Sequence, residues 1–240
     1  MSYTMGSLFS GIGGFDRGFE RAGFRTVWQI EINPYCLKVL AKRFPEAKRY
    51  ADIRDCGTFN LVPVDVICGG DPCQRNSNAW RNGTGAESTA SDFIRIVEQL
   101  RPRIVLRENP SVVRKDAPWP WWRFRMGLER LGYSVLPFRL RSCCTGADHR
   151  RERLYLLAEL PDANRARLEG DERKELEGEN ERRQDTDAGR STRRSPAPRI
   201  CRRADGIPSR MDRLKSLGNA IDPNVAEMLA WRIRRAMEAS

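Results

Sequence analysis

A cysteine in a polar loop is the first residue of this sequence whose type and setting suit catalysis. Asp71-Pro72-Cys73-Gln74 shortly follows residues 64–68, an apolar run typical of a buried strand. A thiolate attacks electrophilic carbon well when nearby cations and dipoles lower the pKa of the thiol. This position favours Cys73 as a nucleophile. A structural cysteine in a turn is the alternative for this tetrapeptide taken alone.

A glycine-rich turn predicts a second kind of chemistry, the binding of a cofactor. Ser10-Gly11-Ile12-Gly13-Gly14 lies between an apolar strand end and a helical stretch, where glycines allow close backbone approach and free helix N–H groups face a ligand. Asp16 stands where a dinucleotide fingerprint has its third glycine, which argues against a nicotinamide cofactor. Glu31 ends the next predicted strand, where a carboxylate can bind ribose hydroxyls. Together, the turn and Glu31 predict a nucleoside-containing cofactor, although tight strand–helix packing would also explain the glycines.

Alternating strands and helices must position these residues. Apolar runs predict strands at residues 7–9, 24–30, 64–68, 104–106, 133–138 and 154–158, and helices at 15–22, 34–44 and 224–237. The expected fold class is therefore α/β, with right-handed crossovers and a sheet rich in parallel strands. Ligands of such folds gather beyond the carboxyl ends of the strands. Four polar or glycine-rich segments lie there: 9–14, Glu31, 69–74 and 108–110. Trp119-Pro120-Trp121-Trp122 is interpreted as the start of a helix packed on the sheet, in preference to a base-stacking platform.

Composition limits the class of protein. The 43 Lys and Arg residues exceed the 32 Asp and Glu residues, which gives a net charge of +11 and favours a polyanionic partner such as nucleic acid, unless the source proteome is simply rich in arginine. No apolar run reaches the ~18 residues of a membrane span, and the first residues lack the pattern of a signal peptide. We therefore expect a cytoplasmic protein without a membrane partner.

The cysteines do not indicate a metal site. None of the seven forms a C-x-x-C pair, and His149 is the single histidine, so a zinc site is not expected. A disulfide scaffold is equally unexpected in a large cytosolic chain, and most of the cysteines are predicted to be buried thiols.

The segment 161–205 differs in composition from the rest of the chain. Residues 169–187 hold nine acidic and four basic residues, whereas residues 188–203 hold six arginines and no acid. Such a segment buries too little apolar surface to fold alone. The predicted organisation is a catalytic and cofactor-binding domain at 1–160, a poorly ordered charged insert at 161–205, and a segment at 206–240 that completes the first domain.

Five motifs in a fixed order resemble one enzyme family. They are 8–15 (LFSGIGGF), Pro72-Cys73-Gln74, Glu108-Asn109, Arg151-Glu152-Arg153 and Gly218-Asn219-Ala220. Their order and approximate spacing resemble those of DNA cytosine-5 methyltransferases, here in a short form of phage or prophage type. The resemblance covers residues 4–160 and again about 206–236. It implies a Rossmann-like methyltransferase fold with S-adenosylmethionine as cofactor and double-stranded DNA as partner.

The resemblance also implies roles for residues at the cofactor site. By the family pattern, Phe9 packs on the adenine, while Gly11, Ile12 and Gly13 line the methionine end. Glu31 would bind the ribose, and Asp52-Ile53 resembles the pair at the adenine edge, where a solvated loop acid is the alternative for Asp52. The remaining expected contacts come from Asn219 and Ala220, which would close the pocket.

The implied catalytic residues are Cys73, Glu108, Arg151 and Arg153. Addition of the Cys73 thiolate to cytosine C6 makes an enamine whose C5 can attack a methyl donor, because C5 alone is too weak a nucleophile. Glu108 would hydrogen-bond the N3 edge, and the two arginines would hold the O2 side. The target base must leave the duplex for this attack.

Three residues depart from the family pattern: Asp71 before Pro-Cys-Gln, Pro110 after Glu-Asn, and His149 before the two arginines. None of them removes a reacting group, and neutral drift is the expected explanation for each.

The insert is expected to take the place of the target recognition domain. Its arginines, together with Gln74, are predicted to contact nucleic acid. They are Arg190, Arg193, Arg194, Arg199, Arg202 and Arg203. Two alternatives to a monomeric DNA methyltransferase stay open: a tRNA cytosine-5 methyltransferase, and an inactive relative that only binds nucleic acid. The four catalytic residues speak against the inactive relative.

Overall fold

The computed structural model describes residues 2–71, 85–110, 121–146, 151–161 and 220–239. All of them belong to one unit, Met1–Ala166 with Ala220–Ser240, whereas the second unit, Arg167–Asn219, lies outside the described residues. The charged insert falls almost wholly in that second unit.

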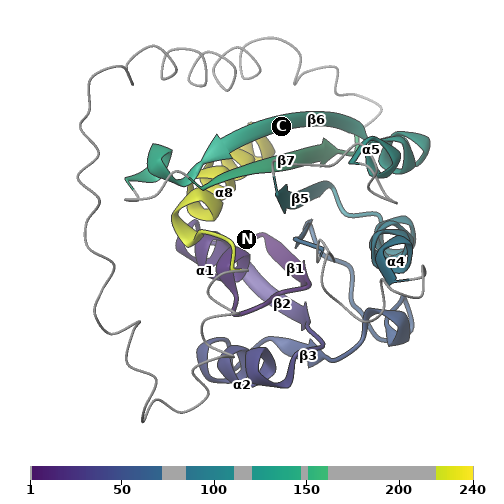
Figure 1. Ribbon diagram of the computed structural model, residues 1–240, viewed down its shortest axis with the longest axis vertical. Coiled ribbons are helices and arrows are strands. Elements are labelled where there is room, and N and C mark those ends of the chain that lie inside the picture. The colour runs from purple at the N-terminus through teal and green to yellow at the C-terminus, as the bar shows by residue number, and fades with distance from the viewer. Residues whose placement is uncertain (1, 72–84, 111–120, 147–150, 162–219, 240) are drawn as a thin grey trace. The chain divides into compact units, whose positions relative to one another are not determined.

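A seven-stranded sheet forms the centre of the first unit, with the order β3-β2-β1-β4-β5-β7-β6 (Figure 1). The strands are β1 (Thr4–Leu8), β2 (Arg25–Ile30), β3 (Lys48–Tyr50), β4 (Val66–Gly69), β5 (Ile104–Pro110), β6 (Ser134–Arg141) and β7 (Glu152–Glu159). The pairs from β3 through β5 are parallel, and β7 is antiparallel to both β5 and β6. The predicted α/β class with a sheet rich in parallel strands is confirmed. The short strand β3 and the reversal of β7 were not predicted.

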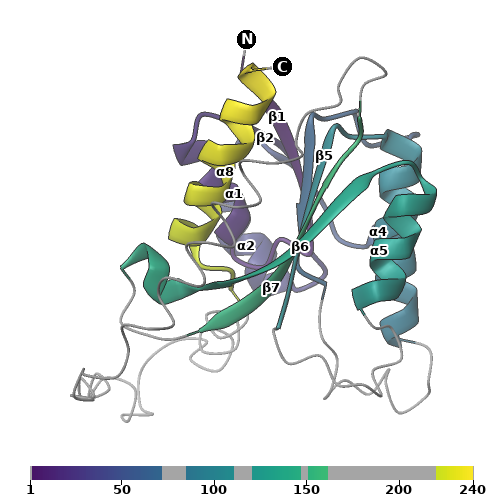
Figure 2. The ribbon, with the colours of Figure 1, turned by 90° about the horizontal axis from the view of Figure 1, so that it is seen from above.

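Helices cover both faces of this sheet. They are α1 (Gly14–Arg21), α2 (Pro34–Arg43), α4 (Gly85–Leu100), α5 (Trp121–Arg130) and α8 (Pro223–Glu238). Two short helical turns lie between strands: η1 (Ile53–Asp55) between β3 and β4, and η2 (Ser142–Thr145) between β6 and β7. Figure 2 shows α1 and α8 on one face of the sheet and α4 and α5 on the other. Each face has its own apolar core. Phe19 and Leu229 belong to the first, and Phe93 and Phe124 to the second.

Local sequence explains where several helices begin. Asn33 caps α2 by accepting hydrogen bonds from the backbone N–H groups of Tyr35 and Cys36, and Pro34 occupies the first turn. Asp222 caps α8 in the same way through the N–H of Asn224. These features bear out the helices predicted at 34–44 and 224–237.

Two details of the sequence interpretation differ in the structure. A helix, α5, begins at Trp121 as predicted, and it packs Trp121 partly and Phe124 and Leu128 fully against the core. Trp122, however, is 44% exposed and does not pack on the sheet. Helical periodicity turns Trp122 outward, since residues 124 and 128 share the face toward the core. The thiols of Cys36, Cys56 and Cys68 are buried as predicted, but Cys143 is exposed because it lies in η2, beyond the edge strand β6.

A buried carboxyl group makes the stability of this fold depend on pH. Asp16 in the first turn of α1 accepts hydrogen bonds from Ser7 Oγ (3.1 Å) and Gln29 Nε2 (2.7 Å). Burial outweighs these hydrogen bonds and raises the pKa of Asp16 from its usual 3.8 to about 6. The protonated form is therefore favoured by folding. Its contribution to stability is present below the unfolded-state pKa and is lost as the pH rises through the folded-state pKa.

Replacing Asp16 with asparagine should remove this pH dependence. The unfolding free energy of the variant, relative to wild type, should grow by about 2 kcal/mol between pH 4 and pH 8, since most of the shift is expressed in that interval. Urea unfolding followed by circular dichroism at several pH values measures the difference. Parallel stability profiles for the two proteins would contradict the assignment.

Candidate active site

The glycine-rich turn lies at the carboxyl end of β1 and leads directly into α1. Phe9, Gly11 and Gly13 adopt left-handed backbone conformations, with φ values of 53°, 57° and 85°. A side chain at Gly13 would overlap Phe44, which directly follows α2, whereas a Cβ at Gly11 would meet no atom within 4 Å. The turn is thus held tightly on one side and faces open space at Gly11, as a ligand-binding turn requires.

Glu31 connects this turn to the start of α2. Its Oε2 accepts a hydrogen bond from the backbone N–H of Gly11 (2.7 Å), and its Oε1 accepts one from the N–H of Asn33 (2.8 Å). Sequence reasoning placed Gly11 and Glu31 at neighbouring strand ends, and the structure brings them into direct contact. It adds Ile32, a 68% exposed apolar side chain beside Glu31, which sequence reasoning missed. A large aliphatic residue directly after a strand-end acid, at the start of a loop, is the sequence signal that could have identified it.

The other residues of the predicted cofactor site lie differently. Phe9 packs partly against the core, with its ring centroid 6.4 Å from that of Phe93. The carboxylate of Asp52 caps η1 and forms an ion pair with Arg54. The hydrogen bond that the Arg54 side chain donates to this carboxylate lowers the pKa of Asp52. The Ile53 side chain is buried in the core, which leaves only its main chain to contact a ligand. The cofactor roles of these three residues stay predictions.

The C-terminal segment returns to the glycine-rich turn. A side chain at Gly14 would overlap the carbonyl of Ile221, and one at Gly18 would overlap Ala226 of α8. These close approaches require glycine on α1. They hold the segment that begins with Ala220 beside the turn, although Ala220 and the turn are more than 200 residues apart in sequence.

Glu108 lies near the end of β5 and faces the end of β4. Its residue surface is 6% exposed, and a Cβ on Gly70 would lie 3.0 Å from Glu108 Oε2 and 3.4 Å from Ile221 Cδ1. Burial raises the pKa of Glu108, and the nearby charges of Arg153 and Arg151 only partly offset this effect. A raised pKa favours the protonated carboxyl group, which is the form from which a general acid donates its proton.

Two arginines, Arg153 on β7 and Arg151 just before it, complete the charged group around Glu108. Arg153 Nε lies 2.7 Å from Glu108 Oε1, and β7 is paired with β5 so that Arg153 opposes Pro110. Arg151 precedes β7 on the same side as Arg153, because strand side chains alternate. Burial and the charge of Arg153 lower the pKa of Arg151. The structure thus brings together three of the four predicted catalytic residues.

A second charged group, which sequence reasoning missed, lies at the same strand ends on the opposite face of the sheet. Arg107 forms a two-pronged ion pair with Asp71, with Nε–Oδ1 at 2.6 Å and Nη2–Oδ2 at 2.7 Å. Asn109 Nδ2 donates a further hydrogen bond to Asp71 Oδ1 (3.0 Å). The signal was present in the sequence, since an acid stood before Pro-Cys-Gln and an arginine stood inside an otherwise apolar strand.

Several predicted site residues lie outside the described residues, and their placement stays a prediction. These are Cys73, Gln74, Asn219, Arg190, Arg193, Arg194, Arg199, Arg202 and Arg203.

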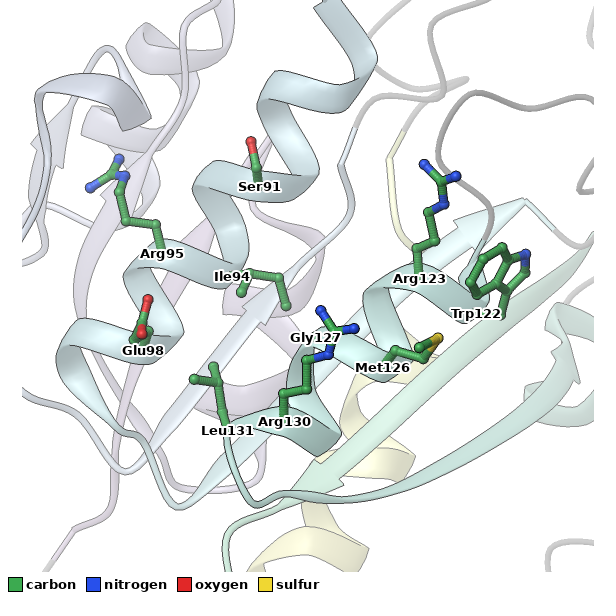
Figure 3. Close-up of a pocket in the computed structure, with 10 residues that line it drawn as sticks. All are labelled: Ser91, Ile94, Arg95, Glu98, Trp122, Arg123, Met126, Gly127, Arg130 and Leu131. Carbon is green, nitrogen blue, oxygen red and sulfur yellow. The ribbon is translucent and has the colours of Figure 1, made fainter.

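A cavity of about 560 Å³ lies between α4 and α5, away from these strand ends (Figure 3). Its walls include Ile94, Trp122 and Met126, and none of the predicted site residues lines it. Within the ranges that the structure describes, no group of acidic, histidine or cysteine residues could hold a metal ion, and no helix is long and apolar enough to cross a membrane.

Sequence comparison relates this chain to known methyltransferases. The family described as C-5 cytosine-specific DNA methylase matches residues 3–195. The type II methyltransferase M1.HphI of Haemophilus parahaemolyticus is 31% identical over 170 residues, which cover 65% of this chain and 46% of that protein. The type II methyltransferase M.NgoBI of Neisseria gonorrhoeae is 35% identical over 162 residues, which cover 65% of this chain and 50% of that protein. The chain spans about half the length of these curated relatives.

Structural comparison agrees with this relationship. A prophage-encoded E. coli protein assigned as a DNA modification methyltransferase superposes with a TM-score of 0.55 at 28% identity, over 66% of this chain and 47% of that chain. The DNMT2 protein of Spodoptera frugiperda gives a TM-score of 0.54 at 23% identity, over 71% of this chain and 54% of that chain. At this identity, the likeness supports a shared fold and nothing about function. The sheet with its reversed β7 is therefore a Rossmann-like methyltransferase fold. With the match of the family over residues 3–195, this chain belongs to the C-5 cytosine-specific DNA methylase family.

Proposed function

We propose that this protein is a DNA (cytosine-5)-methyltransferase that transfers a methyl group from S-adenosylmethionine to C5 of a flipped-out cytosine. The observation that carries this proposal is the buried Glu108 with its raised pKa, 2.7 Å from the Arg153 guanidinium and beside the end of β4. Cys73, the proposed nucleophile, follows the end of β4 by four residues in the sequence.

The residues around the glycine-rich turn fit the proposed cofactor. The family is one of S-adenosylmethionine-dependent methyltransferases. Each Glu31 oxygen receives one backbone hydrogen bond, which leaves lone pairs for ribose hydroxyl donors. Gly11 faces open space, and the exposed side chain of Ile32 offers an apolar surface to an adenine. When bound, S-adenosylmethionine would supply the electrophilic methyl group.

The chain's own residues would perform the other steps. The Cys73 thiolate would bond to cytosine C6 while Glu108 donates a proton to N3, which makes C5 an enamine carbon. Arg151 and Arg153 would stabilise the developing charge on the O2 side. After C5 has taken the methyl group, a water molecule accepts the C5 proton, the C6–S bond breaks to release the Cys73 thiolate, and the N3 proton returns to Glu108, which restores the ring. Extrusion of the base from the duplex costs a few kcal/mol.

A methyl-transfer assay with labelled S-adenosylmethionine tests the substrate class. Duplex DNA and total tRNA are offered separately to the wild-type chain, and acid-stable label in 5-methylcytosine is measured. Label in duplex DNA alone supports the proposal. Label in tRNA alone would replace it with an RNA methyltransferase, and label in neither substrate would favour a binding protein without activity.

We also propose that residues 161–205 recognise the target DNA. Six arginines without an intervening acid at 188–203 supply charges for phosphates and for guanine edges, to which arginine donates two hydrogen bonds. The short length and charged composition of the segment support ordering by its ligand over an independent core.

DNA affinity should fall steeply as salt concentration rises. Each phosphate neutralised adds roughly −0.9 to the slope of log affinity against log salt. Replacing Arg193 and Arg194 with glutamine should therefore make this slope about 2 units shallower. Fluorescence anisotropy with labelled duplex between 50 and 300 mM salt measures the slope. Replacement of the exposed Arg25 and Arg43 on the described unit serves as the control, and an equal change in both variants would contradict the assignment to this segment.

A further inference from the structure

A buried polar network lies directly behind the proposed catalytic acid. Asp71 and Arg107 form their two-pronged ion pair with side chains only 9% and 4% exposed, and Asn109 donates to the same carboxylate. The Arg107 guanidinium lies 4.0 Å from the ring centroid of Phe124 on α5. The forked guanidinium group of Arg107 is thus bound by the Asp71 carboxylate and packed against the Phe124 ring.

Strand geometry places this network and Glu108 on opposite faces of the sheet. Side chains alternate along β5, so Arg107 and Asn109 share one face while Glu108 points to the other. The end of β4 shows the same division: Gly70 faces the Glu108 carboxylate, and Asp71 faces the network. Arg107 and Asn109, which flank Glu108 in the sequence, therefore both donate hydrogen bonds to Asp71, two residues before Cys73.

Stability alone does not account for such a network. Two charges withdrawn from water lose their hydration, and a well-packed apolar pair of similar volume often serves folding equally well. What the ion pair adds is direction, because the planar guanidinium and the carboxylate meet in one relative orientation. That orientation sets the position of the β4 end against β5.

We propose that Asp71, Arg107 and Asn109 are positioning residues for methyl transfer, which hold Glu108 and the start of the Cys73 segment in one fixed relation. This inference rests on the proposed function. None of the three needs to touch the base. They act through Glu108 and through the chain that leads to Cys73.

Two single variants measure the effect on turnover. Arg107→Lys keeps the charge and removes the fork, and Asp71→Asn keeps the size of the acceptor and removes its charge. Each should lower kcat for DNA methylation by about 10- to 100-fold, since small displacements of reacting groups have effects of this size. The KM for DNA and the Kd for S-adenosylmethionine should stay within about two-fold, because none of the three residues is among those proposed to contact the base or the cofactor. Arg125→Lys alters an exposed ion pair with Glu129 on α5 and should leave kcat unchanged.

A double variant separates positioning from folding. Asp71→Leu with Arg107→Met replaces the ion pair by an apolar pair and should fold with a melting temperature close to that of wild type. If the network positions the site, this well-folded variant keeps the low kcat. A double variant that folds and turns over at the wild-type rate would overturn the inference.

The outcomes also separate this inference from the function on which it rests. A wild-type chain that transfers no methyl group to any nucleic acid overturns both. An active wild type, with single and double variants that are equally active, overturns the positioning role and leaves the proposed function standing. An active wild type with a low kcat in all three variants, at unchanged KM, supports both.

Discussion

Replacing Cys73 with serine should abolish methyl transfer, because a serine hydroxyl is not deprotonated near neutral pH and cannot add to cytosine C6 as a thiolate does. We expect no detectable product above background and an unchanged Kd for S-adenosylmethionine. Methyl incorporation into duplex DNA and equilibrium binding of the cofactor measure the two effects separately. Cys143→Ser offers a matched control, since Cys143 is an exposed thiol in η2, and should keep wild-type activity.

A mechanism-based trap gives a second measurement of the same residue. Duplex DNA that contains 5-fluorocytosine should form an adduct with the wild type that resists denaturation, because the fluorine at C5 prevents the elimination that releases the thiolate. The adduct should require S-adenosylmethionine and be absent from Cys73→Ser. An adduct that forms equally with both proteins would exclude Cys73 as the nucleophile.

Replacing Glu108 with glutamine should lower kcat by about 10²- to 10⁴-fold, the usual contribution of a positioned acid or base. Glutamine keeps the shape of the side chain and can still donate a hydrogen bond, but it cannot deliver a proton to N3. Burial raises the pKa of Glu108 and so favours the protonated form that this step needs. Single-turnover rates on duplex DNA measure the effect without the contribution of product release.

The control for this variant is Glu129→Gln, which changes an exposed carboxylate paired with Arg125 on α5. It should turn over at the wild-type rate. The variant at Glu108 should also retain cofactor binding, since Glu31 and the glycine-rich turn lie at the ends of other strands. Turnover of Glu108→Gln within about two-fold of wild type would remove Glu108 from the proposed mechanism.

Much of the fold follows from local sequence patterns. Apolar runs indicated β1, β2, β4, β5, β6 and β7, and the caps at Asn33 and Asp222 mark the starts of α2 and α8. Strand β3 was missed because its three residues, Lys-Arg-Tyr, have no apolar alternation. They form a strand because their backbone pairs with that of β2. The outward orientation of Trp122 was missed because a cluster of aromatic residues does not reveal which face of a helix is buried.

The sequence by itself determined the types of chemistry: a glycine-rich turn followed by a strand-end acid, and Glu-Asn at the end of an apolar strand. These features are encoded within short windows, where backbone conformation and side-chain type act together. The tertiary structure alone decided which of them meet. Reversal of β7 sets Arg153 2.7 Å from Glu108, and the neighbouring ends of β4 and β5 join Asp71 to Arg107. Those contacts depend on strand order and direction, which arise from the packing of the whole core. The periodicity of a short window does not specify either of them.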